Sequence, residues 1–204
     1  MLQVRDLGVA RGGVPVLEGV RFELAAGEAL ILRGPNGIGK TTLLRTLAGL
    51  QPALSGEIEM PEDCAAYASH KDGIKSQLTV EENLEFWARI YGRSVPEEVY
   101  ADFDLTDLRT RFAGTLSAGQ TRRLGLARLG VIGRDLLLLD EPTVSLDTAS
   151  VALFGDFLRT RHLARGGAAV IATHIDLGLE APVLDLTPNK AAPHAGGGRD
   201  EAFL

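Results

Sequence analysis

A glycine-rich run near the N-terminus constrains this chain more than any other feature, because few folds can use it. The run has the spacing G-x-x-x-x-G-K-[ST] and comprises Gly34, Pro35, Asn36, Gly37, Ile38, Gly39, Lys40, Thr41 and Thr42. Small residues let several backbone N–H groups turn toward a phosphate. Residues 28–33 are typical of a strand that enters the loop, and residues 41–48 of a helix that leaves it. The run therefore predicts a nucleotide-binding P-loop, with Lys40 on the β- and γ-phosphates of ATP and the Thr41 hydroxyl on Mg²⁺.

Composition excludes several classes of protein. The 204 residues fit one domain, and a hydrophobic content of 45% supports a normal packed core. The formal net charge of −6 argues against a nucleic-acid partner, which usually needs a basic face. Cys64 is the only cysteine in the sequence, so we expect no internal disulfide, as in a reducing cytosol. Because no apolar run approaches the ~20 residues of a membrane helix, we expect partner subunits to do any membrane work.

The middle of the chain differs from its two ends in the secondary structure that its sequence pattern predicts. Residues 79–112 are strand-poor and helical, and capping boxes that begin at Thr79 and Ser94 predict two helix starts. The last residues are rich in Gly, Ala and Pro, which is typical of a flexible segment. We predict one domain over residues 1–185, with a helical lobe of about residues 72–130 inserted in an α/β core, and a flexible tail over residues 186–204.

Two further segments suit a nucleotide site. An apolar run at residues 136–139 has the character of a buried parallel strand and ends in Asp140 and Glu141, at the sheet edge where ligands bind. Asp140 is suited to hold Mg²⁺, and Glu141 to orient an attacking water. The sequence Leu-Ser-Ala-Gly-Gln at residues 116–120 offers an anion a hydroxyl and a helix N-terminus, although taken alone it is more typical of a capped helix start at Ser117.

The order of these segments resembles the ATP-binding-cassette (ABC) ATPases over about residues 2–185. After the P-loop come residues 116–120, the Asp-Glu-Pro that ends the apolar strand, Ser-Leu-Asp at residues 145–147, and Thr-His at residues 173–174. The resemblance implies an α/β P-loop NTPase fold, with a RecA-like parallel-sheet core, an N-terminal antiparallel β subdomain and an inserted helical subdomain. It also implies that two copies dock head to tail and enclose ATP between them.

The resemblance assigns a role to each matching position. Lys40, Glu141 and His174 would be catalytic, with Glu141 acting on the water and His174 sensing the γ-phosphate. Thr41 and Asp140 would hold Mg²⁺. Residues 116–120 are the signature segment of the family, and Ser117, Gly119 and Gln120 of the opposite copy would contact the nucleotide. Asp147 would lie at the interface between the two copies.

Two positions depart from the family pattern. Where an aromatic residue usually stacks on adenine, the spacing from residues 16–17 places Arg11, whose planar guanidinium is able to stack on a base. Where a glutamine usually follows the strand near Ser69, this chain has Lys71. Both departures predict local differences in base binding and in metal coordination.

Several details resemble the ATP-binding export subunits of cytochrome c maturation. These are the short chain, the signature followed by residues 121–129, the segment 70–84, and the residues at positions 11 and 71. The resemblance implies an ATPase that works with transmembrane permease subunits at the cytoplasmic face of the bacterial inner membrane. ATP hydrolysis would drive haem export, or release of a haem-loaded periplasmic chaperone, without contact between haem and this chain. The segment at about residues 69–82 would contact the membrane partner.

Other functions fit the sequence less well. Another small ABC exporter is the main alternative, and a soluble ABC ATPase would usually carry two cassettes or a long coiled-coil insertion. Asn189 and Lys190 resemble part of a guanine-reading motif, but Ala192 stands where a GTPase needs Asp. A non-hydrolysing regulator is disfavoured because Glu141 and His174 fill both hydrolytic positions.

Overall fold

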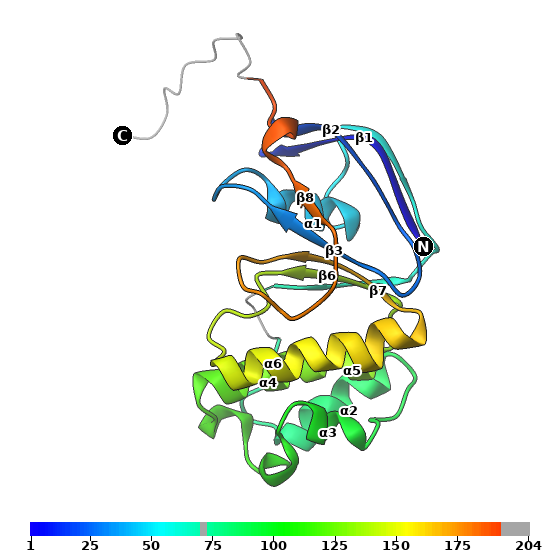
Figure 1. Cartoon of the computed structure of the whole chain (residues 1–204). Coiled ribbons are helices and arrows are strands. Elements are labelled where there is room, and N and C mark those ends of the chain that lie inside the picture. Colours follow the sequence, from blue (N-terminus) through cyan, green and yellow to red (C-terminus); the bar gives the residue numbers. More distant parts are fainter. Residues whose placement is uncertain (70–72, 193–204) are drawn as a thin grey trace.

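Two β-sheets and a group of helices make up the computed structural model, which describes residues 1–69 and 73–192 (Figure 1). The antiparallel sheet has the order β2-β1-β4. Its strands are β1 (Leu2–Arg11), β2 (Val14–Leu24) and β4 (Ser55–Glu59). Gly12 and Gly13 join β1 to β2 in a hairpin, with φ values of 56° and 84° that favour glycine.

The second sheet is parallel and has the order β5-β6-β7-β3-β8. Its strands are β3 (Ala29–Arg33), β5 (Ala65–Ala68), β6 (Leu136–Asp140), β7 (Ala168–Ala172) and β8 (Val183–Asp185). The predicted P-loop strand, β3, lies beside β7, and β7 lies beside β6. Because parallel strands end at the same edge, the segments that follow these three strands meet there.

The side chains of β6 separate the two hydrophobic cores. Leu136 and Leu138 pack with the antiparallel sheet and with α1 (Lys40–Leu47), which lies between the two sheets in Figure 1. Leu137 and Leu139 pack on the opposite face, against the helices. Successive side chains of a strand point to opposite faces, so a strand covered on both sides must be apolar throughout. The run of four leucines follows from this position.

Helices fill most of the chain between β5 and β6. They are α2 (Val80–Ile90), α3 (Glu98–Asp102), α4 (Ala118–Ala127) and α5 (Leu129–Ile132), with short 3₁₀ turns at Thr106–Leu108 and Ala113–Thr115. They gather with α6 (Thr148–Phe157) on one side of the parallel sheet (Figure 1). No helix of the described residues is both long enough and apolar enough to cross a bilayer.

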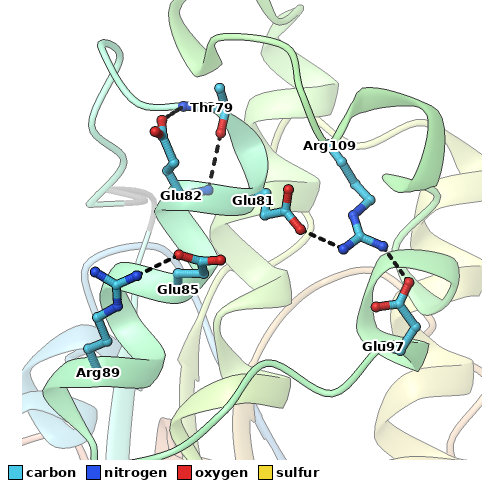
Figure 2. Close-up of polar contacts among 7 residues, drawn as sticks. All are labelled: Thr79, Glu81, Glu82, Glu85, Arg89, Glu97 and Arg109. Carbon is cyan, nitrogen blue, oxygen red and sulfur yellow. Dashed lines mark hydrogen bonds and ion pairs between the residues drawn. The ribbon is translucent and has the colours of Figure 1, made fainter.

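Polar contacts hold the start of α2 (Figure 2). The Thr79 hydroxyl accepts from the Glu82 amide at 3.2 Å, and the Glu82 carboxylate accepts from the Thr79 amide at 2.8 Å. This reciprocal pair is the capping box that the sequence predicts there. Arg109 bridges Glu81, at 2.5 Å, and Glu97, and so joins α2 to the residues before α3 (Figure 2).

The second predicted capping box does not form. α3 begins at Glu98, four residues after Ser94, and its N-terminus has no side-chain cap. Glu97, whose side chain would have accepted a hydrogen bond in the capping box, forms an ion pair with Arg109 instead. A long-range ion pair has therefore replaced the local contact.

The residues after β8 pack against β2. Leu186 is fully buried, the Asn189 side-chain amide donates to the carbonyls of Glu18 and Gly19 at 3.1 and 3.0 Å, and the Ala191 amide donates to Val16. The expectation of a flexible tail is therefore wrong for residues 186–192, because one apolar side chain and these hydrogen bonds tie the segment down. Residues 193–204 lie outside the described residues.

Candidate functional site

The P-loop joins β3 to α1 at the carboxyl edge of the parallel sheet. Gly39 is the N-cap of α1 with a φ of 122°, and a Cβ there would lie 3.0 Å from the Leu17 side chain, so only glycine fits. No side chain caps α1, and its first N–H groups face the loop. Lys40 is 8% exposed, and its Nζ donates to the Gly34 carbonyl at 2.8 Å. The loop, the helix N-terminus and the Lys40 ammonium group are together suited to bind phosphates.

Asp140, the last residue of β6, lies between two hydroxyl groups. Thr41 Oγ1 donates to Asp140 Oδ1 at 3.1 Å, and the Tyr67 hydroxyl, from the neighbouring strand β5, donates to Asp140 Oδ2 at 3.0 Å. Burial and the negative charge of Asp140 raise the pKa of Tyr67 to about 12. Tyr67 therefore remains a hydrogen-bond donor at neutral pH and fixes the orientation of the carboxylate.

The oxygens of Thr41 and Asp140 fit Mg²⁺. This cation prefers hard oxygen ligands and usually takes one or two from the protein, with the rest from phosphates and water. In residues 1–69 and 73–192, no group of three or more His, Cys, Asp or Glu side chains is placed to hold a metal ion. The pair is therefore suited to a Mg²⁺ ion that shares its coordination with a nucleotide.

The predicted catalytic side chains lie close to one another. Glu141 Oε1 lies 3.7 Å from His174 Nε2, which in turn lies 3.4 Å from Lys40 Nζ. The three residues come from the ends of β6 and β7 and from the start of α1. Arg33, at the end of β3, donates to the Thr173 carbonyl and so fixes the segment that carries His174.

A cavity of about 240 Å³ lies at this point and receives Arg11 from the β1–β2 hairpin. Its walls are formed by Arg11, Asn36, Gly37, Gly39, Lys40, Thr41, Asp140 and Glu141. This volume is below the roughly 300–1,000 Å³ that is usual for pockets that enclose a ligand. A larger cavity of about 620 Å³, beside Asp135 and Gly167, lies at the opposite edge of the sheet and holds none of the predicted site residues.

The signature segment lies away from this cavity. Ser117 caps α4: its Oγ accepts from the Gln120 amide at 3.2 Å, while Gln120 Oε1 accepts from the Ser117 amide at 2.9 Å. Gly119 lies beside Ser145, whose carbonyl would be 3.5 Å from a Cβ on the glycine. Asp147 caps α6, and the hydrogen bond from the Ser150 amide lowers the pKa of its carboxyl. The structure thus brings residues 117–120 to residues 145–147, but not to the chain's own P-loop.

The sequence did not single out Tyr67. The parallel pairing of β5 with β6 places it opposite Leu138, two residues before Asp140 on the same face, but strand order cannot be derived from the motifs. Lys71, which stands where the family usually has glutamine, lies outside the described residues.

The chain matches the protein-family model for ABC transporters over residues 17–144. This chain belongs to the ABC transporter family. It is 62% identical over 204 residues to the cytochrome c biogenesis ATP-binding export protein CcmA of Rhodobacter capsulatus, covering all of this chain and 95% of the relative. The CcmA of Roseobacter denitrificans is also 62% identical, over 205 residues that cover all of this chain and 99% of the relative. Within its family, this ABC ATPase belongs with these export proteins.

Solved structures agree with membership of the ABC transporter family. An ATP-binding subunit of an ABC transporter superimposes with a TM-score of 0.76 at 25% identity, covering 86% of this chain and 80% of that chain. The structure of cbiO1 from Clostridium perfringens, part of the ABC transporter complex cbiONQ, gives a TM-score of 0.71 at 25% identity and covers 85% and 78%. The predicted α/β cassette, with a parallel core and an antiparallel sheet, is confirmed.

Proposed function

We propose that this ABC ATPase hydrolyses ATP between two of its copies to drive haem export, or release of a haem-loaded periplasmic chaperone, in cytochrome c biogenesis. The convergence of Lys40, Glu141 and His174 at the P-loop supports hydrolysis. The assignment to cytochrome c biogenesis rests on relatives that match the whole chain at 62% identity and are named for that process.

Lys40, Glu141 and His174 have different roles in hydrolysis, which follow from their charge and position. Lys40 and the N-terminus of α1 neutralise the β- and γ-phosphates, so that the γ-phosphorus can accept an in-line nucleophile. Glu141 orients the attacking water and accepts its proton. His174, between Glu141 and Lys40, contacts the γ-phosphate. When bound by Thr41 and Asp140, Mg²⁺ supplies further neutralisation of the phosphate charge.

A second copy completes each site. Its signature segment, with Ser117, Gly119 and Gln120, faces the γ-phosphate held by the first copy's P-loop. Two observations support this arrangement: the cavity beside the P-loop is open to solvent, and residues 117–120 are not among the residues that line it. The N-terminus of α4, a helix of 10 residues, favours an anion at that place.

The membrane work falls to other subunits. ABC ATP-binding subunits act together with membrane components, and we place this chain at the cytoplasmic face of the bacterial inner membrane, bound to the permease subunits of a cytochrome c maturation complex. Its contact runs through residues 69–82, and neither haem nor nucleic acid touches the chain. The second candidate function is the same ATPase activity in another small ABC exporter.

Capture of the complex tests this function. Tagged Glu141→Gln protein, purified with ATP from detergent-solubilised membranes of the native host, is expected to bring down cytochrome c maturation membrane subunits with a haem-bearing chaperone, as identified by mass spectrometry. The Lys40→Ala protein serves as the control, because it should not hold the ATP-bound state. Recovery of an unrelated permease would be consistent with the ATPase activity but would contradict the role in haem export.

Arg11 is proposed to stack on the adenine ring. Its side chain lines the cavity with the P-loop, at the position where the family usually has an aromatic residue. Stacking of a guanidinium on an aromatic ring is worth about 1 kcal/mol, so Arg11→Ala should weaken ATP binding roughly fivefold. Equilibrium binding of ATP and of inorganic triphosphate checks this, since only ATP affinity should fall. Equal losses for both ligands would mean that Arg11 acts by charge alone.

A further inference from the structure

The backbone of Glu141 adopts a conformation that needs support. Its φ is 48°, in the left-handed region, which costs a residue with a side chain about 1–3 kcal/mol. The Glu141 amide donates to the Ala172 carbonyl of β7 at 2.8 Å, which fixes the residue on its N-terminal side. The carbonyl side belongs to a turn, where the Val144 amide approaches the Glu141 oxygen only at 3.4 Å. That side requires a further contact.

Arg122 makes this contact from the signature helix. It lies in α4, five residues after Ser117, and is 3% exposed. Its Nε donates to the Pro142 carbonyl at 2.9 Å, and its Nη2 reaches the Glu141 carbonyl at 3.3 Å. Its Nη1 donates to the carbonyl of Ser69, just after β5, at 2.7 Å. One guanidinium thus joins the catalytic turn to the end of a neighbouring strand.

The chemistry of arginine suits this position. The guanidinium is planar and permanently charged, and its donors point in fixed directions. Because it holds the carbonyls of both Glu141 and Pro142, it fixes the peptide that follows the catalytic carboxylate. Hydrogen bonds from a charged donor are stronger than neutral ones, and burial strengthens them further. A lysine carries the same charge at a single atom and cannot span these oxygens in the same way.

We propose that Arg122 is the positioning residue for Glu141: it holds the turn after β6 in the conformation that presents the Glu141 carboxylate to the attacking water. The proposal rests on the proposed role of Glu141 in hydrolysis. Helix α4 would then have two roles. Its N-terminus contacts the nucleotide of the opposite copy, and its Arg122 supports the catalytic carboxylate of the same copy. In this role Arg122 acts through the backbone of Glu141 and Pro142 and not on ATP or the attacking water.

Steady-state kinetics of the full-length chain in its assembled transporter test the proposal. Misplacement of a reacting group by about 1 Å can cost ~100-fold in rate, so Arg122→Gln is expected to lower kcat by between about tenfold and about 100-fold. The ATP dissociation constant should stay within about twofold, because the P-loop is untouched, and Arg122→Lys should give an intermediate kcat. The matched control is Arg161→Gln, which removes a paired arginine bound to Asp102 at 3.0 Å and should leave kcat unchanged.

A double-mutant cycle separates positioning from a general structural role. In the Glu141→Gln background, Arg122→Gln should lower the residual hydrolysis by less than about twofold, because its effect passes through the missing carboxylate. A full additional loss in that background, or a normal kcat for folded Arg122→Gln, would overturn the proposal. If Arg122→Gln fails to fold, as judged by thermal unfolding, Arg122→Lys carries the same cycle. Wild-type hydrolysis by Glu141→Gln alone would instead overturn the role of Glu141, and the positioning role with it.

Discussion

Replacing Glu141 by glutamine is expected to lower kcat for ATP hydrolysis by about 10²–10³-fold while ATP binding is kept. Glutamine has nearly the same shape as glutamate but carries no negative charge and is a poor proton acceptor. The contacts that we propose to hold ATP, from Lys40 and the N-terminus of α1, do not involve the Glu141 side chain. The variant should therefore bind ATP and stop before the chemical step.

Two measurements check this expectation. Single-turnover hydrolysis gives the loss in rate, and size-exclusion chromatography with and without ATP shows whether the variant accumulates as a dimer. The control is Glu62→Gln, which removes the same charge at an exposed position before β5 and should hydrolyse ATP at the normal rate. A Glu141→Gln protein that matches the wild-type rate in the assembled transporter would remove Glu141 from the catalytic group.

The P-loop and the acidic pair could be predicted because local chemistry dictates them. The left-handed φ values of Gly37 and Gly39 restrict those positions to glycine, and the sequence records this restriction directly. β6 is covered on both faces, so its side chains are apolar up to Asp140, whose carboxylate accepts hydrogen bonds from Thr41 and Tyr67. Such constraints act within a few residues, and one sequence is enough to recognise them.

The residues that support the site could not be predicted in the same way. Tyr67 acts on Asp140 only because β5 pairs with β6, and Arg122 acts on Glu141 only because α4 packs over the end of that strand. Both contacts depend on how segments distant in the sequence are placed. The failed capping box at Ser94 has the same origin, since Arg109 competes for Glu97 from 12 residues away. Local rules predict local contacts, and tertiary partners can displace them.

Replacing Lys40 by alanine is expected to weaken ATP binding by roughly 10–100-fold. A hydrogen bond to a charged group contributes about 1.5–3 kcal/mol, and each 1.4 kcal/mol is about tenfold in affinity. Lys40 is 8% exposed and close to His174, so its ammonium group is shielded from solvent and its attraction for phosphates is not fully screened. Hydrolysis should fall further than affinity, because charge on the γ-phosphate must be neutralised as the bond breaks.

Binding of ATP and of AMP distinguishes this mechanism from a general loss of structure. Because Lys40 is proposed to act on the β- and γ-phosphates, Lys40→Ala should lower the affinity for ATP much more than the affinity for AMP, whose only phosphate lies in the α position. The control is Lys190→Ala, which removes the same charge from an exposed side chain after β8. Thermal unfolding of the free protein shows whether the P-loop still folds without the bond from Lys40 to Gly34. If Lys40→Ala and wild type bind ATP with equal affinity, the phosphates do not bind at Lys40. The attacking water would then not lie where Glu141 is proposed to orient it.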